Sequence, residues 1–339
     1  MSKSKQNICG MCGTAHNGND TLCRICRKAN PSLGFLDPRK QKNVVVAPTV
    51  LKAKTIDNSI PYPKGGVVIP HKEHRDYSAT IVITTPDTLG ENYRYCKHMI
   101  DEHTPGEHRI IIVESHFNEK PYNWARDINI GLRGAQNSDY YVILNDDVFV
   151  EEGWLDKLVE CMKQDSKIGI VGVLLFYPGK KMIQHAGGAY NSNHDKSWEE
   201  IGMMPVKHDY QGAMATMAPG SLKQRDVPWC TGALLMVRGS CLKDIGLLDE
   251  KLVGHCDDVE LCYRAWLKHW RVVYYPDVQA VHREAITRRQ TLRDVPDFMK
   301  NATEYLCTIL TEEDAKLVDV LVEKSNKRNY IKLKKLLHL

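Results

Sequence analysis

A short apolar run that ends in clustered acids is the feature that most constrains the fold of this chain. Residues 140–144 are apolar, and Asn145, Asp146 and Asp147 follow at once. Such a run predicts a buried strand that carries carboxylates to the edge of a sheet, where ligands bind in open α/β folds. Oxygen ligands at that edge suit Mg²⁺ or Mn²⁺ held against phosphates. A strand-to-turn junction explains the same residues, because Asn and Asp favour turns.

Strands and helices alternate from about residue 77 onward. The patterns predict strands at 80–84, 109–113, 140–144 and 169–176, and helices near 90–103, 123–135 and 153–164. This alternation predicts an α/β fold with a mainly parallel sheet and helices on both faces. The long, Gly- and Met-rich segment 179–227 indicates a functional loop or lid. Residues 290–339 read as helical, with Leu317, Val320 and Leu321 on one packed face.

Six further stretches occur in an order typical of one enzyme family. They are Ala79-Thr-Ile-Val-Ile-Thr-Thr-Pro86, Arg109-Ile-Ile-Ile-Val-Glu114, residues 122–131 with their two Asn, Trp229-Cys-Thr-Gly-Ala-Leu-Leu-Met-Val-Arg238, Ile245-Gly-Leu-Leu-Asp-Glu250 and Asp257-Asp-Val-Glu-Leu-Cys-Tyr-Arg264. With the 140–147 motif, they resemble the GT-A glycosyltransferases of the family 2 type over residues 77–289. The resemblance implies a Rossmann-like GT-A domain, an inverting mechanism and a nucleotide-sugar donor.

The resemblance also implies a metal site. Asp147 aligns with the last acid of the family's D-x-D motif and is the expected ligand for Mn²⁺ or Mg²⁺. Asn145 takes the first position of that motif, where a neutral amide would contact the ribose or a metal-bound water. Asp146 is a further candidate, although neighbours on a strand point to opposite faces. His282 ends a strand–turn–strand pattern and matches the family's metal-binding His, whereas a lone His is ordinarily a packed or surface residue.

Asp258 is the expected general base. It begins a predicted helix, where the helix dipole keeps a carboxylate ionised, as a base requires. An Asp at a helix start is otherwise a cap. Asp257 is the neighbour expected to bind the acceptor or to hold the base, and it is the base itself if the register differs by one residue.

On the donor side, the resemblance implies five residues. Thr85 and Pro86 end the first strand, where the family wraps the nucleotide base. Glu114 ends the second strand, in place of the usual Asp, as an acceptor for uracil or ribose. Arg126 and Asn129 lie on the helix that faces the nucleotide in relatives, and Arg126 is suited to pair with phosphate. Each of these residues is also readable as an ordinary surface polar residue.

Cys9, Cys12, Cys23 and Cys26 form two C-x-x-C knuckles. Four thiolates at this spacing close a tetrahedral Zn²⁺ site, which we expect to be structural because sulfur fills every position. A redox pair or disulfides are the alternatives, and a cytosolic compartment disfavours the latter.

Charge is uneven along a chain whose formal net charge is only +4. Residues 1–42 hold eight Lys or Arg against two Asp, and a second basic run lies near the end. Basic termini suit a polyanion or an anionic membrane, or are simply solvated. The polar start has no apolar region after it, so we expect no secretory signal and a cytoplasmic protein. No apolar stretch is long enough to span a bilayer.

We therefore expect a zinc ribbon (1–33), a linker packed on the catalytic domain (34–76), a GT-A domain (77–289) and a C-terminal helical extension (290–339). The predicted reaction is metal-dependent hexosyl or pentosyl transfer from a nucleotide sugar, with UDP favoured, to a hydroxyl of a macromolecule. The basic ribbon points to a nucleic acid, as in DNA modification, while a protein or a lipid-linked glycan stays open. The alternative is an inactive GT-A domain that serves with its ribbon as a binding adaptor.

Overall fold

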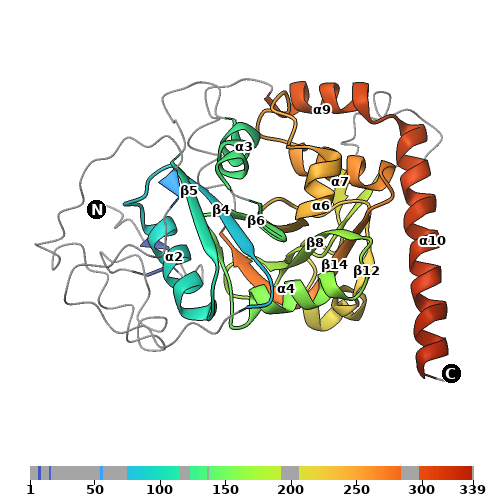
Figure 1. Ribbon diagram of the computed structural model, residues 1–339, viewed down its shortest axis with the longest axis horizontal. Helices are drawn as coiled ribbons and strands as arrows, with labels where there is room; N and C mark the ends of the chain where they lie inside the picture. Colours follow the sequence, from blue (N-terminus) through green and yellow to red (C-terminus); the bar gives the residue numbers. More distant parts are fainter. Residues whose placement is uncertain are drawn as a thin grey trace, which may run out of the picture.

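The computed structural model describes residues 75–114, 123–135, 137–191, 206–283 and 298–337 (Figure 1). It also describes three two-residue strands, β1 (Asn7–Ile8), β2 (Ala15–His16) and β3 (Lys54–Thr55). β1 and β2 pair antiparallel, and β3 pairs antiparallel with β5. Cys9, Cys12, Cys23 and Cys26 lie outside the described residues. The zinc site and the domain boundaries around it therefore stay predictions.

One mixed sheet forms the centre of the molecule. Its strands lie in the order β12 (Arg225–Asp226), β14 (Arg271–His282), β8 (Ile168–Phe176), β13 (Leu234–Arg238), β6 (Tyr140–Asn145), β4 (Ala79–Thr85), β5 (Arg109–Glu114) and β3. β4 is parallel to β5 and β6, and β8 is parallel to β14. The predicted mainly parallel α/β sheet is confirmed.

β13 is the one long strand of the described sheet that runs against its neighbours, β6 and β8. The amide of Asn145 donates to the carbonyl of Ala233 over 3.0 Å, so β13 begins beside the end of β6. A strand that starts at the carboxyl edge of the sheet has to run back through it. This arrangement brings the turn before β13 to the same edge as the acids that follow β6.

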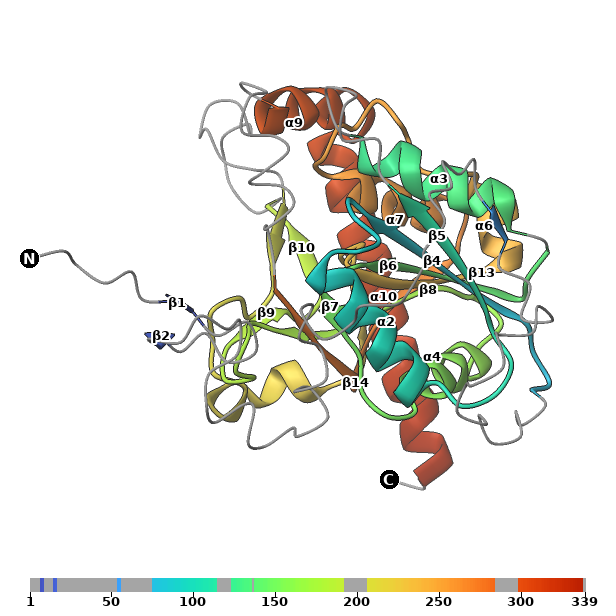
Figure 2. The ribbon, with the colours of Figure 1, turned by 90° about the vertical axis from the view of Figure 1, so that its left-hand side faces the viewer.

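Helices cover both faces of the sheet, as predicted (Figure 2). α2 (Glu91–His103) and α4 (Trp154–Lys163) pack on one face, and α3 (Trp124–Gly134), α6 (Gly239–Ile245) and α7 (Asp257–Leu267) pack on the other. Alternation along β4 feeds both apolar layers, since Val82 joins one layer while Ile81 and Ile83 join the other. A Cβ on Gly131 of α3 would lie 2.3 Å from Cγ1 of Val82, so only glycine permits this close approach of helix and strand.

The segment predicted as a loop or lid is folded into short elements where the structure describes it. They are β9 (Ile183–His185), β10 (Gly188–Tyr190), β11 (Val206–His208), two 3₁₀ turns, η3 (Ala215–Met217) and η4 (Pro219–Leu222), and β12 of the central sheet. β9 pairs with β8, and β10 pairs with β11. These pairings carry polar side chains from the segment to the carboxyl edge of the sheet.

The predicted strand–turn–strand before His282 is one strand, β14. Its pairing with β8 shifts register between Tyr275 and Gln279, around Pro276, which has no N–H to donate to a neighbour. Beyond this irregularity the strand continues to His282, which pairs with Val148 of β7 (Val148–Phe149). The strand end therefore lies beside the turn that holds Asp147.

The C-terminal region is helical, as predicted, in α9 (Phe298–Ile309) and α10 (Glu312–Leu337). α10 lies along α7 and β12 (Figure 1). Its packed face holds the buried Ala315 and Val318, whereas Leu317 and Val320 are 48% and 43% exposed. The predicted packed face is thus wrong for these two residues, because the helix is rotated so that they face outward. Within the described residues, no helix combines the length and apolar character that crossing a membrane requires.

Candidate active site

A pocket of about 220 Å³ lies at the carboxyl edge of the sheet. Its lining includes Pro86, Asn145, Asp146, Asp147, Asp257, Asp258 and His282 from the predicted site. Thr85 lies directly behind this lining through its contact with Asp146. Glu114, Arg126 and Asn129 are not among the lining residues. The structure thus brings the expected metal ligands and the expected general base into one pocket. Three of the residues expected to bind the nucleotide lie outside the pocket lining.

The two acids after β6 are both buried, at 5% and 4% exposure for Asp146 and Asp147. They lie in a turn between β6 and β7, so the alternation expected for strand neighbours does not apply and both reach the pocket. The hydroxyl of Thr85 donates to Oδ2 of Asp146 over 2.7 Å. Burial, followed by the neighbouring charge of Asp147, raises the pKa of Asp146 to about 7. Asn145 accepts a hydrogen bond from the indole N–H of Trp124 at 3.0 Å.

Asp147 lies against His282, with Oδ1 3.1 Å from Nε2 of the imidazole. Burial alone would raise the pKa of Asp147, but the charge and hydrogen bond of His282 outweigh it, and the pKa is lowered. Nδ1 of His282 lies 2.7 Å from Oε1 of Gln184, and Nε2 of Gln184 faces the carbonyl of His282 at 3.3 Å. The amide oxygen accepts, so Nδ1 of His282 carries a proton. Nε2 is then the ring atom that faces the Asp147 carboxylate, where a shared proton or a cation would stabilise the pair.

This arrangement fits a hard divalent cation. Mg²⁺ sites in nucleotide enzymes often use one or two protein side chains, with phosphates and waters filling the other positions. Asp147 and His282 supply such a pair, and Gln184 fixes the ring of the histidine as outer partners of metal ligands do. In the part of the chain that the structure describes, no group of three His, Cys, Asp or Glu side chains is placed to hold a metal ion. The remaining ligands would therefore come from the substrate and water.

Asp257 and Asp258 begin α7, and both line the pocket. Oδ2 of Asp258 accepts from the amide of Gly232 over 2.7 Å, and Oδ1 accepts from the amide of Val259 over 2.8 Å. Asp257 is buried, and its Oδ1 accepts from the amide of Asp258 at 3.1 Å. The residue at the helix N-cap is Cys256, whose φ of 65° is left-handed. Asp258 is thus held in the pocket by a backbone amide from the turn before β13.

Glu114 ends β5 and is exposed beside the turn that follows β4. Its Oε1 lies 3.4 Å from the hydroxyl of Thr88. Glu114 therefore lies beside Thr88 and is not among the residues that line the pocket. Its contact with the nucleotide base stays a prediction.

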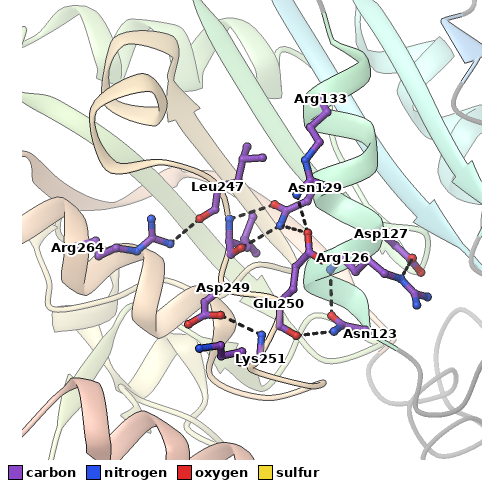
Figure 3. A network of polar contacts seen from close by, with 11 residues as sticks. Asn123, Arg126, Asp127, Asn129, Arg133, Leu247, Asp249, Glu250, Lys251 and Arg264 are labelled. Atoms are coloured by element: carbon purple, nitrogen blue, oxygen red, sulfur yellow. Dashed lines mark hydrogen bonds and ion pairs between the residues drawn. The ribbon is translucent and has the colours of Figure 1, made fainter.

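Asn129 and Arg126 belong to a polar network that joins α3 to residues 247–251 (Figure 3). The Asn129 amide donates to the carbonyl of Leu248 and to Oε1 of Glu250, both at 2.9 Å, and accepts from the amide of Leu248 at 3.0 Å. Nε of Arg126 pairs with Asp127 at 3.3 Å. Asn129 is 1% exposed, and its side chain holds the loop before α7 against α3.

A family model named "Glycosyltransferase like family 2" matches residues 76–303, most of the chain. The chain belongs to glycosyltransferase family 2. Membership makes it a glycosyltransferase and agrees with its mainly parallel α/β sheet. The matched range includes every pocket residue described above, from Pro86 to His282.

Two curated relatives are rhamnosyltransferases. "N-acetylglucosaminyl-diphospho-decaprenol L-rhamnosyltransferase" of Mycobacterium tuberculosis is 24% identical over 43% of this chain and 48% of its own length. "Rhamnosyltransferase WbbL" of Escherichia coli is 26% identical over 43% of this chain and 53% of its own. The chain thus spans about half the length of the curated relatives that it matches. A crystal structure of GalNAc-T7 with UDP, GalNAc and Mn²⁺ covers 61% of this chain and 44% of its own, at 16% identity and a TM-score of 0.45.

Several pocket residues of this family 2 enzyme were not predicted from its sequence. Among them, Gln184, His185 and His208 come from the segment that was predicted as a loop or lid. A single polar residue in a segment without periodicity carries no local signal of its role. The pairings of β9 with β8 and of β10 with β11 bring these side chains to the pocket, and neither pairing follows from the residues alone.

Proposed function

We propose that this family 2 enzyme transfers a sugar from a nucleoside-diphosphate sugar to an acceptor hydroxyl, with inversion at the anomeric carbon. The observation that carries the proposal is that one pocket is lined both by the Asp147–His282 pair and by Asp258. A direct displacement needs a group that stabilises the leaving diphosphate and a base for the attacking hydroxyl.

On the leaving-group side, Asp147 and His282 would hold a divalent cation, Mn²⁺ or Mg²⁺. When bound, such an ion supplies a Lewis acid that neutralises charge on the departing diphosphate. Gln184 accepts a hydrogen bond from Nδ1 of His282, which leaves Nε2 as the ligand atom. Thr85 orients Asp146, the neighbour of Asp147, through a hydrogen bond. We propose a UDP-sugar as the donor to test first.

On the acceptor side, Asp258 takes the proton of the attacking hydroxyl. Each of its oxygens accepts a hydrogen bond from one backbone amide, and these bonds orient the carboxylate. Each oxygen keeps a further lone pair that can take the proton. Correct placement of the base relative to the hydroxyl supplies much of the rate in such a reaction. Asp257 fixes the first turn of α7 through the amide of Asp258 and so supports the base.

For the acceptor, we favour a lipid-linked glycan over the nucleic acid that the basic N-terminal segment indicated. A relative is named for transfer to N-acetylglucosaminyl-diphospho-decaprenol, and neither curated relative is named for a nucleic acid. The inactive adaptor is the less favoured alternative, because Asp147, Asp258 and His282 all line the pocket.

The test is release of nucleoside diphosphate from UDP-, dTDP- and GDP-sugars by the full chain, with Mn²⁺ and with EDTA. We expect metal-dependent release from one nucleotide class, stimulated by a diphospho-polyprenol-linked N-acetylglucosamine. A protein that binds the nucleotides but releases nothing with any acceptor would favour the adaptor. Stimulation by DNA or RNA alone would reverse our preference for the acceptor.

A further inference from the structure

Two histidines meet on the pocket wall, apart from the metal and base residues. His185 ends β9, His208 ends β11, and their Nδ1 atoms lie 2.8 Å apart. The indole of Trp229 packs against both rings, with centroids 5.3 Å from His185 and 4.8 Å from His208. All three residues line the pocket, and His185 is almost fully buried. The pair is therefore a built feature of the site.

The hydrogen bonds determine where each ring carries its proton. The backbone amide of Thr231, which can only donate, lies 3.2 Å from Nε2 of His185. Nε2 of His185 must therefore accept, and a neutral ring then has its proton on Nδ1. The Nδ1–H of His185 donates a hydrogen bond to Nδ1 of His208. Because Nδ1 of His208 accepts, the proton of a neutral His208 is on Nε2. Burial is the largest cause that lowers the pKa of His185 well below its ordinary value, and it keeps the ring neutral.

The next amide along the chain reaches the expected base. Thr231 donates to His185, and Gly232 donates to Oδ2 of Asp258 over 2.7 Å. Two consecutive peptide groups are thus anchored, one on the histidine pair and one on the base. A Cβ on Gly232 would lie 2.5 Å from the Trp124 ring, so this backbone is also packed against a side chain of α3.

We propose that His185 is a positioning residue of the transfer reaction, with His208 fixing its proton. Through Nε2, His185 holds the amide of Thr231, and this contact sets the neighbouring Gly232 amide in place for Asp258. His208 accepts a hydrogen bond from the Nδ1–H of His185 and so favours the tautomer in which Nε2 of His185 is unprotonated. The inference rests on the proposed function in one respect, the role of Asp258 as general base.

The proton order is measured without any activity. In ¹⁵N-labelled full chain at neutral pH, long-range ¹H–¹⁵N correlations of the imidazoles should report the Nδ1–H tautomer for His185 and the Nε2–H tautomer for His208. The two spectra are assigned by their loss in the variants His185→Gln and His208→Asn. A proton on Nε2 of His185, or a charged ring at either position, would overturn the proposal.

The positioning role is measured with two pairs of variants. His185→Gln keeps an acceptor for the Thr231 amide, and His185→Leu removes it. We expect the kcat for nucleoside diphosphate release to fall by roughly 10-fold in the Leu variant, the size of one net hydrogen bond, with the KM for the donor unchanged. The Gln variant should recover most of that loss. His208→Asn and His208→Leu form a second pair, because the Asn side chain can still accept from Nδ1 of His185.

His98→Gln is the matched control, since His98 is exposed on α2 and pairs with Glu102. Equal losses in the Gln and Leu variants of both histidines, or a wild-type kcat in both Leu variants, would overturn the positioning role. Thermal melting checks that each variant folds. If wild-type protein turns over no donor, the proposed function fails, while the tautomer measurement still decides the proton order.

Discussion

Nε2 of His282 lies 3.1 Å from Oδ1 of Asp147, while Gln184 holds the other ring nitrogen of the same histidine. Three separate strands and turns supply these residues, namely β14, the turn after β6, and β9. A histidine fixed from behind and facing a buried carboxylate is ordered before any ligand arrives. Preorganisation of this kind lowers the cost of binding a cation and a diphosphate together.

Asp147→Ala should abolish sugar transfer while leaving the fold intact. Loss of a metal ligand removes charge stabilisation of several kcal/mol from the leaving diphosphate, which corresponds to a rate loss of roughly 10³-fold or more. The measurement is nucleoside diphosphate release, with thermal melting as the check on folding. Asp101→Ala is the control, because Asp101 pairs with Lys97 on the exposed face of α2. Wild-type activity that persists in EDTA would contradict the prediction.

Gln184→Leu should weaken cation binding without removing a ligand. Partners behind a metal-binding histidine typically contribute roughly 10–100-fold in metal affinity. Titration of Mn²⁺ in the presence of UDP, followed by electron paramagnetic resonance, measures this affinity. Gln224→Leu is the control, since Gln224 is exposed and bonds Gln164 away from the pocket. Unchanged Mn²⁺ affinity in Gln184→Leu would argue that His282 needs no orientation.

Asp258→Asn should leave donor binding unchanged and lower turnover by roughly 10²–10⁴-fold, the usual size of general-base catalysis. The amide oxygen of Asn can still accept from Gly232, so the local structure should survive. If Asp258 served only to hold the Gly232 amide, the single amide oxygen of Asn would replace it and the rate would change little. Asp257→Asn is the paired variant. If Asp257→Asn is inactive while Asp258→Asn remains active, the general base is Asp257.

Glu250→Gln should make stability less dependent on pH. The hydrogen bond from Asn129 lowers the pKa of Glu250 below its ordinary value of 4.5, burial opposes this, and Arg133 adds to the lowering. A carboxylate with a lowered pKa in the folded state contributes stability that is complete above its unfolded pKa. That contribution is lost as the pH falls from about 4.5 through the folded pKa.

The measurement is the melting temperature of wild type and Glu250→Gln from pH 7 to pH 3. The wild-type protein should melt higher at pH 7, and the difference should shrink as the pH falls below about 4.5. When both proteins also carry Arg133→Gln, the difference in melting temperature between them at pH 7 should be smaller, because Arg133 bonds the same carboxylate at 2.8 Å. A difference that stays constant across this range would contradict the link to ionisation of Glu250.

The purified chain should hold about one Zn²⁺ through Cys9, Cys12, Cys23 and Cys26, the spacing of a four-thiolate site. Metal analysis of freshly reduced protein measures this content, and Cys9→Ser with Cys12→Ser should lose it. Cys96→Ser is the control, because Cys96 is a buried thiol of α2 that packs in the core. Freshly reduced wild-type protein without zinc would refute the ribbon.

Much of the fold was accessible from local patterns. Apolar runs such as 140–144 predicted buried strands, and the carboxyl ends of parallel strands share one edge, so acids at a strand end indicated the pocket. Helical spacing after Asp258 predicted α7 correctly. The same kind of evidence misassigned the packed face of α10, because the rotation of a helix is set by what it packs against, and Leu317 and Val320 face outward.

The sequence by itself determined the alternating strands and helices, the acids after β6 and the start of α7, because these depend on residues that are near neighbours in the chain. Only the tertiary structure decided that Asn129 holds Leu248 and Glu250, that Gln184 orients His282, and that His185 meets His208. The physical reason is that a lone polar side chain takes its role from groups brought to it by distant strand pairing. Local periodicity carries no information about such partners.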